Sequence, residues 1–157
     1  MGTRVATTEG MSVGALCMRV VEIASPEEPV REVARRMAAA AVGTVVVVGA
    51  ERRPLGILTD RDIVLRCVAE GRDPEATPVA AVMSAPAVCV HESTPIESAL
   101  ARMAGVPARR LVVIDDAQQL VGVLALDDIL ELLAEEAASI GRLLAGRRRR
   151  SGVPDPR

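Results

Sequence analysis

The sequence contains no phenylalanine, tyrosine or tryptophan. Val, Leu, Ile, Ala and Met must therefore fill the interior, and a single-stranded nucleic-acid platform, which stacks bases on aromatic rings, is disfavoured. Lysine is absent as well, so that all nineteen basic residues are arginines. This absence excludes a Schiff-base lysine and the lysine of a phosphate-binding P-loop.

Cysteines are few and scattered. Cys17, Cys67 and Cys89 form neither a Cys-x-x-Cys motif nor a Cys/His ligand spacing, so a disulfide framework and a zinc site are unsupported. Long hydrophobic runs are also missing, because the apolar, uncharged stretch at residues 37–50 is shorter than the ~18 residues that suggest a membrane span. With no secretory signal at its start, the chain is expected to be cytoplasmic and to contact no membrane.

What the chain does contain is an internal repeat with an offset of sixty-six residues. Residues 56–67, which join a strand end, an acidic turn and a helix start, are echoed by residues 122–133. Self-similarity on this scale has to be recognised before a fold is assigned. The identical pairs are Val13/Val79, Ala15/Ala81, Pro29/Pro95, Arg36-Met37-Ala38/Arg102-Met103-Ala104, Val46-Val47/Val112-Val113, Gly56/Gly122, Leu58/Leu124 and Asp62-Ile63/Asp128-Ile129.

The hydrophobic period switches in the same order in both units, which predicts strand, helix, strand, strand, helix. An amphipathic helix is expected to begin at Pro29 in the first unit. In the second unit, Thr94 as N-cap, Pro95 at the first helical position and Glu97 at the third predict a capping box. The last helix is expected to run to about Ala145. The predicted strands are residues 20–23, 45–48 and 55–58 in the first unit, and 87–90, 111–114 and 120–124 in the second.

These patterns divide the chain into five parts. One unit alone is too small for a good core, so the two units are expected to pack face to face about a pseudo-two-fold axis. The parts are a disordered start (1–10), a first repeat (11–71), a turn-rich linker (72–78), a second repeat with an extended C-terminal helix (79–145) and a basic tail expected to be disordered (146–157).

Several of these motifs together resemble the tandem CBS-domain pair, also called a Bateman module. The resemblance covers about residues 11–136 and implies an α/β (α+β) fold of two βαββα CBS repeats. The motifs are Met83-Ser-Ala-Pro-Ala-Val-Cys-Val before the first strand, Thr94-Pro-Ile-Glu-Ser-Ala-Leu before the helix, Arg109-Arg-Leu-Val-Val-Ile-Asp at the middle strand, and Gly56-Ile-Leu-Thr-Asp-Arg-Asp at the acidic turn.

The resemblance implies a function without catalysis. Members of the family hold adenosine ligands such as AMP, ADP, ATP or S-adenosylmethionine in a cleft between their repeats, and no cofactor is required. They commonly regulate an enzyme or transporter, fused to them or met in trans, and often dimerise through their helices into a disc. A regulatory sensor that forms a homodimer is therefore the leading expectation.

The resemblance also assigns candidate ligand-binding residues. Asp62 and Asp128 close the family's Gly-x-x-Thr-x-x-Asp motif, and their carboxylates would accept hydrogen bonds from ribose hydroxyls. Thr59 corresponds to a hydroxyl that helps to hold phosphate near a helix start. Arg109 and Arg110 stand where the family often places basic residues against phosphate, a task that suits the guanidinium fork.

Asp60 and Asp127 complete the candidate set, although negative charge in a first helical turn also suits the helix dipole with both side chains facing solvent. A structural interpretation competes for the other residues of the motif. Thr59-x-x-Asp62 is also a capping box, worth ~1 kcal/mol to helix stability without any ligand.

The two potential sites are unequal in sequence. Asp128 persists although Ala125 has replaced the threonine with which it would form a reciprocal cap, which favours a ligand contact. Gly43 and Thr44 stand in the first unit where the second has its arginine pair. One well-formed site and one degenerate site are expected.

Two other functions remain open at this point. The chain could be a structural dimerisation or protein-interaction module whose cleft stays empty. Less favoured is a nucleic-acid tether through the arginines at 147–150, because the net charge of the whole chain is −2. An enzyme is disfavoured further, since His91 is the single histidine and no nucleophile is placed beside it by the sequence.

Overall fold

The structure is a computed structural model that describes residues 10–150, with side chains described through residue 145. The predicted order of strand, helix, strand, strand, helix is confirmed in both repeats. The first contains β1 (Ile23–Ala24), α2 (Val30–Ala40), β2 (Thr44–Val48), β3 (Pro54–Thr59) and α3 (Asp60–Ile63), which continues as a π-helical turn, η2 (Val64–Val68). The second contains β4 (Cys89–His91), α4 (Ile96–Ala104), β5 (Arg110–Ile114), β6 (Leu120–Ala125) and α5 (Leu126–Arg150). Short helical turns are α1 (Val13–Leu16), η1 (Ala50–Arg52) and η3 (Val79–Ala81).

Each repeat contains one three-stranded sheet, ordered β1-β2-β3 or β4-β5-β6. In both sheets the first pair of strands is parallel and the second pair is antiparallel. The register also repeats, because Val47 lies opposite Gly56 just as Val113 lies opposite Gly122, and the same irregularity follows each pair. The predicted mixed fold with two equivalent repeats is therefore confirmed.

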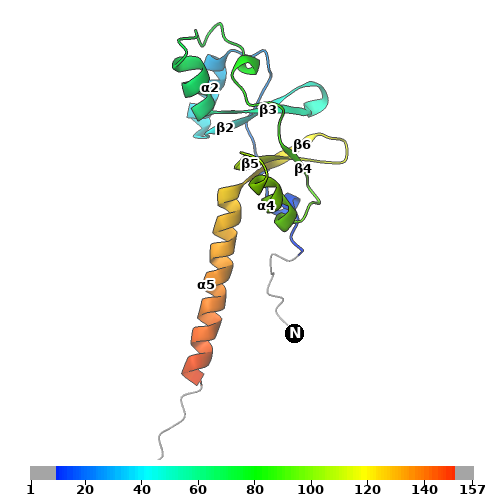
Figure 1. Ribbon diagram of the computed structural model, residues 1–157, viewed down its shortest axis with the longest axis vertical. Helices are drawn as coiled ribbons and strands as arrows, with labels where there is room; N and C mark the ends of the chain where they lie inside the picture. The colour runs from blue at the N-terminus through cyan, green and yellow to red at the C-terminus, as the bar shows by residue number, and fades with distance from the viewer. Residues whose placement is uncertain (1–9, 151–157) are drawn as a thin grey trace, which may run out of the picture.

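The two sheets face each other and bury their central strands between them (Figure 1). Val46 of β2 and Val112 of β5 are both fully buried, and they share an apolar cluster with Leu120 and Val123 of β6. The sequences of β2 and β5 are continuous aliphatic runs because each strand packs against helices on one face and against the opposite sheet on the other.

The segment that leads into each repeat packs on the other repeat. Val13 and Cys17 lie in the core of the second repeat, and Val79 and Val82 lie in the core of the first. The backbone joins these segments to the sheets, since Met18 N–H donates to the Val123 carbonyl at 2.9 Å. Neither repeat therefore has a complete core without the other.

The predicted boundaries differ from the structure in three respects. The first strands begin later than residues 20 and 87, since only Ile23 and Ala24 of β1 pair with β2, and Val20 is 91% exposed. The predicted N-cap at Thr94 is also wrong, because α4 begins after Pro95 without a side-chain cap. The Thr94 carbonyl instead accepts the Val13 N–H at 2.8 Å, which holds this segment extended against the leading segment.

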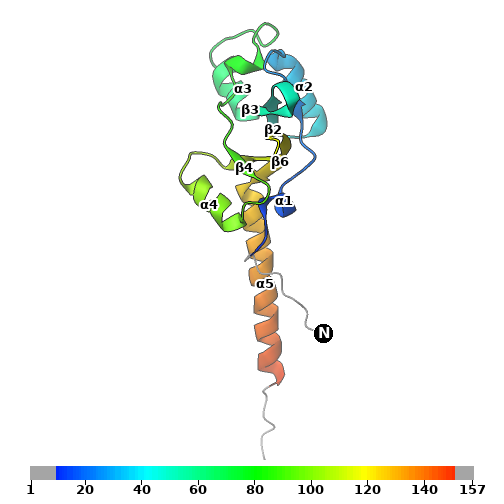
Figure 2. The same cartoon turned by 90° about the vertical axis from the view of Figure 1, so that its right-hand side faces the viewer.

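The third difference concerns α5, which extends from the second repeat away from the body of the molecule (Figure 2). The helix continues to Arg150 rather than ending near Ala145 and giving way to disorder, because arginine is a good helix former and basic residues suit a helix C-terminus. The rest of the predicted tail, 151–157, and residues 1–9 of the predicted disordered start lie outside the described residues. Among the described helices, none is long and apolar enough to cross a membrane.

Candidate functional site

A cleft of about 430 Å³ lies between the repeats, and we call it the first cleft. It combines residues from β3 and α3 of the first repeat with residues from the loop before β5 and from the start of β5. Four of the predicted site residues thereby come together, although they are up to fifty-one positions apart in the sequence. The polar and charged residues that line the cleft are Thr59, Asp62, Arg66, Ser84, Arg109 and Arg110.

Thr59 and Asp62 form the predicted capping box at the start of α3. The Thr59 hydroxyl accepts the Asp62 N–H at 3.1 Å, while Asp62 Oδ2 accepts the Thr59 N–H at 3.0 Å and the Thr59 hydroxyl at 2.7 Å. The other carboxylate oxygen, Oδ1, lies 3.5 Å from the Ser84 hydroxyl. The cap therefore engages one oxygen of Asp62 and leaves the second oriented toward the Ser84 edge of the cleft.

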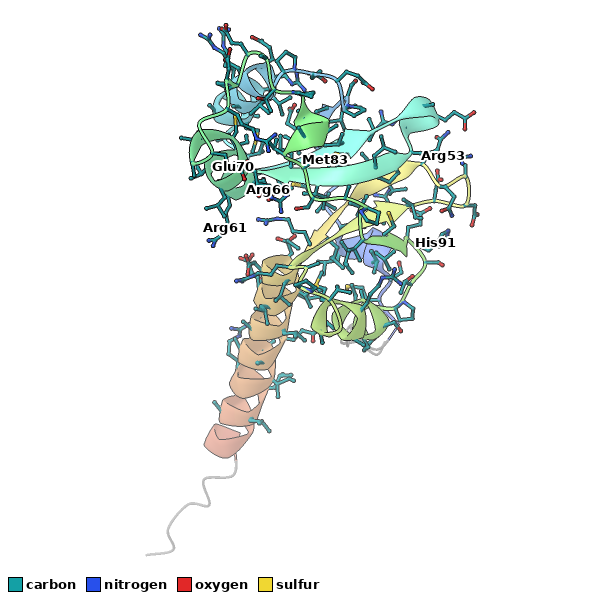
Figure 3. The ribbon with its side chains drawn as sticks, turned by 45° about the horizontal axis from the view of Figure 1, so that its top comes forward. Arg53, Arg61, Arg66, Glu70, Met83 and His91 are labelled. Carbon is teal, nitrogen blue, oxygen red and sulfur yellow. The ribbon has the colours of Figure 1, made fainter. Side chains whose placement is uncertain are left out.

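Arg66 and Ser84 also line the cleft, although neither was predicted as a site residue. Arg66 Nη1 donates to the carbonyls of Val82 and Met83 at 2.9 and 3.0 Å and to the Ser84 hydroxyl at 3.2 Å. Its Nη2 lies 3.4 Å from Asp62 Oδ1. Figure 3 shows Arg66 at the lower edge of the first repeat, facing the second. The sequence feature that could have identified Arg66 is its spacing of four residues from Asp62, which puts both side chains on one helical face.

Arg109 and Arg110 approach the first cleft from the second repeat. Arg109 Nη2 lies 3.0 Å from Asp127 Oδ1, and both side chains are largely exposed. Arg110 lies at the start of β5 and lines both this cleft and a second one. The first cleft therefore has three guanidinium groups against one carboxylate, which is an anion-attracting balance.

The second cleft, of about 310 Å³, is lined by the residues that occupy the equivalent positions in the repeat. Its charge has the opposite sign, because Glu22, Asp127 and Asp128 stand against Arg110. The substitutions explain this reversal. At an offset of sixty-six residues, Thr59, Ser84, Val88, Arg109 and Arg110 of the first cleft correspond to Ala125, Met18, Glu22, Gly43 and Thr44 of the second, and Arg66 corresponds to Leu132.

The second cleft contains one unusual polar atom. Thr44 Oγ1 is buried without a hydrogen-bond partner, the one such side-chain oxygen or nitrogen among the described residues. Thr44 stands where the first cleft has Arg110, so a short hydroxyl has replaced a cation that could reach a phosphate. The two sites, which were predicted to be unequal, therefore also differ in the polar and charged groups that line them.

Asp60 lies apart from the other candidates. It lines a separate surface hollow between α2 and α3, and its Oδ1 accepts the Arg61 N–H at 2.7 Å. Asp127 and Asp128 belong to the second cleft rather than the first. The seven predicted residues therefore divide among three places: four in the first cleft, two in the second, with Arg110 shared, and Asp60 outside both.

Comparison with known proteins gives consistent results. The family model described as "CBS domain" matches residues 13–68 and 79–135. The CBS domain-containing protein YhcV of Bacillus subtilis is 42% identical over 110 residues, which are 69% of this chain and 76% of that protein. An uncharacterized protein of Methanopyrus kandleri is 34% identical over 122 residues, or 78% of this chain, and the match spans 62% of that relative's length. Among solved structures, a CBS domain protein from Pyrobaculum aerophilum complexed with AMP is 28% identical, with a TM-score of 0.69 over 81% of this chain and 98% of that one.

Proposed function

Because this chain belongs to the CBS-domain family, with two CBS domains in tandem, we propose that it is a regulatory module that binds an adenine nucleotide in its first cleft. The observation that carries the proposal is the convergence of Asp62 with Arg66, Arg109 and Arg110 in one cleft between the repeats. Its volume of about 430 Å³ lies within the range of small-molecule sites.

Each part of a nucleotide has a matching group in the proposed site. Asp62 Oδ1, beside the Ser84 hydroxyl, would accept hydrogen bonds from the ribose diol. Arg109 and Arg110 would form charge-assisted hydrogen bonds with phosphate oxygens. The base would lie against the apolar part of the lining, which includes Ile57 and Val88.

The charge of the first cleft favours an anionic ligand over a cationic one. Its three arginines would attract AMP, ADP or ATP, whereas the sulfonium and ammonium groups of S-adenosylmethionine would be repelled. The relative from Pyrobaculum aerophilum, complexed with AMP, supports the same choice. We therefore place AMP, ADP and ATP ahead of S-adenosylmethionine for this site.

The second cleft is proposed as the degenerate site. Glu22, Asp127 and Asp128 would repel phosphate, and Arg110 is shared with the first cleft. A nucleotide that binds the first cleft would engage Arg110 and further reduce the positive charge available to the second.

The proposed output is regulation of an enzyme or transporter met in trans by a homodimer of this chain. Ligand binding can serve this purpose because the first cleft contains residues of both repeats, so occupancy would stabilise one arrangement of the two repeats. No step of this proposal requires catalysis or a cofactor.

A second function, an interaction module with an empty cleft, is favoured by one observation. The capping box of Thr59 and Asp62 is completely formed, so these two residues have a structural role whether or not a ligand binds. Under this alternative, exposed helical surface would join copies or partners, and nucleotides would have no effect on stability.

Thermal unfolding with AMP, ATP and S-adenosylmethionine distinguishes the two functions. The increase in melting temperature caused by saturating nucleotide should be lost in Asp62→Ala and retained in Asp128→Ala, its equivalent in the second cleft. The ligand-induced shift is the relevant quantity, because Asp62→Ala also removes a cap worth ~1 kcal/mol. The absence of a shift in the parent protein would support the empty-cleft module instead.

A further inference from the structure

Helix α5 projects from the body of the molecule (Figures 1 and 2). Along the projecting part it presents large apolar side chains to solvent. Leu133 is 36% exposed, Ile140 53%, Leu143 63% and Leu144 58%. Such side chains are normally covered when several share one helix face, since each loses stabilising burial while it faces water. The body of the protein does not cover this face.

The spacing of the apolar residues is that of a coiled coil. Successive gaps of three, four, three and four residues place them at the a and d positions of consecutive heptads. This period of 3.5 residues keeps one seam in register with a partner helix, whereas a helix packed on a globular core follows a period nearer 3.6. The seam consists of Leu130, Leu133, Ala137, Ile140 and Leu144, whereas Leu126 packs against the core of the second repeat.

Charge along α5 is completely separated by sign. In sequence, residues 126–138 contain five acidic residues and no basic one, and residues 139–150 contain five arginines and no acidic residue. The helix dipole accounts for charges in the first and last turns only. It does not account for Glu131, Glu135 and Arg142, which lie farther inside the helix. Two copies side by side would bring like charges together if parallel and opposite charges together if antiparallel.

We propose that α5 forms an antiparallel two-helix coiled coil with α5 of a second copy of this chain. With the two-fold axis at the middle of the helix, Leu133 meets Leu144 of the second copy and Ala137 meets Ile140. The two outer layers then pair leucines, the two central layers pair a small with a large side chain, and the acidic half of each helix lies beside the basic half of the other. Helix α5, about 37 Å long, has room for this overlap without contact between the two bodies.

A second copy fits this surface better than a lipid bilayer does. In a two-fold dimer, the same face of both copies forms the interface, so this face must be complementary to itself. A helix with one acidic and one basic half meets this requirement only in the antiparallel orientation. Helices that bind anionic lipid have a basic polar face along their whole length, whereas the first half of this one is acidic. The inference does not depend on nucleotide binding, and it names the surface that joins the proposed homodimer.

Analytical ultracentrifugation of the full chain over a range of concentrations tests the seam. The double variant Ile140→Gln/Leu144→Gln should raise the dimer dissociation constant by at least about a hundredfold, because four apolar side chains per dimer lose their burial. The matched control, Ala138→Gln/Ala145→Gln, changes two exposed positions of the same helix outside the seam and should leave the dimer intact. A monomeric parent protein, or a dimer that the seam variant does not weaken, would overturn the proposal.

Disulfide cross-linking tests the orientation. Chains carrying Leu133→Cys and chains carrying Leu144→Cys should cross-link to each other when mixed and oxidised, and neither should cross-link efficiently to itself. The parent chain, oxidised in parallel, controls for Cys17, Cys67 and Cys89. Efficient self-cross-linking of the Leu144→Cys chain would show a parallel pair and contradict the antiparallel arrangement. Binding to vesicles of anionic lipid that the seam variant abolishes, with no dimer in solution, would identify a lipid surface instead and also contradict it.

Discussion

Asp127, in the first turn of α5, holds Arg109 at the mouth of the first cleft, with 3.0 Å between Asp127 Oδ1 and Arg109 Nη2. The pair joins the two clefts, because Arg109 lines the first and Asp127 lines the second. The equivalent positions of the first repeat are occupied by Gly43 and Arg61, so no such pair exists there. A phosphate in the first cleft would compete with Asp127 for the same guanidinium group.

Removal of this competitor should strengthen nucleotide binding. Asp127→Asn is expected to raise the affinity for ATP by roughly two- to fivefold, since an exposed ion pair is worth up to about 1 kcal/mol. Adenosine, which lacks phosphate, should bind the variant and the parent equally. Isothermal titration calorimetry measures both ligands.

Asp60→Asn is the matched control, because Asp60 lies in the first turn of the equivalent helix but outside both clefts. It removes the same charge from the whole protein. An equal gain in ATP affinity from Asp60→Asn would show a general charge effect and would rule out competition for Arg109.

Two glycines at equivalent positions should tolerate no side chain. A Cβ on Gly56 would lie 2.7 Å from the Ser84 carbonyl oxygen, and a Cβ on Gly122 would overlap the Met18 carbonyl oxygen. Both obstacles are backbone atoms of the leading segment that crosses the sheet. Gly56→Ala and Gly122→Ala are each expected to reduce the free energy of unfolding by about 2 kcal/mol or more, as measured in urea.

Gly141→Ala is expected to change the free energy of unfolding in the opposite direction. No atom lies within 4 Å of a Cβ at this helical position, so alanine should stabilise the protein by about 0.5–1 kcal/mol through its higher helix propensity. Unfolding free energies of Gly122→Ala and Gly141→Ala that change in the same direction would contradict the tight crossing of the leading segment.

The Glu28–Arg36 ion pair should make stability depend on pH. The hydrogen bond from Arg36 lowers the pKa of Glu28, with a further contribution from the Ser25 N–H. A lowered folded-state pKa stabilises the protein above the pKa of the unfolded chain, and this stabilisation is lost as the pH falls through the folded value.

The parent protein should therefore be more stable than Glu28→Gln at pH 7, by less than about 1 kcal/mol because the pair is partly exposed. The difference should shrink toward zero in acid. Urea unfolding from pH 7 down to pH 3 measures it, with Glu32→Gln, on the neighbouring exposed helix surface, as the control. A difference that stays constant or grows as the pH falls would contradict the lowered pKa of Glu28.

Much of the fold could be predicted because its determinants are local and occur twice. The aliphatic runs of β2 and β5 and the glycines at 56 and 122 recur at one offset, and the Thr59–Asp62 capping box is encoded within four residues. The first strands were less predictable, since β1 contains only two residues at a sheet edge and its apolar neighbour Val20 faces solvent.

The exchange of leading segments could not be predicted from local patterns. Val13 packs in the second repeat and binds the Thr94 carbonyl, which also explains why the expected cap at Thr94 failed. Ser84 was not predicted as a cleft residue for the same reason. Its backbone pairs with Ile57, and the linker at residues 72–78 separates these two residues in the sequence. Long-range pairings of this kind leave no periodicity in the sequence.

The number of AMP molecules bound per chain tests the central claim most directly. Isothermal titration calorimetry of AMP into this chain should give one site per chain, because the first cleft combines Asp62 with three arginines while the second is acidic and lacks the equivalents of Arg66 and Arg109. Two equivalent sites per chain, or no binding at AMP concentrations in the millimolar range, would contradict the account.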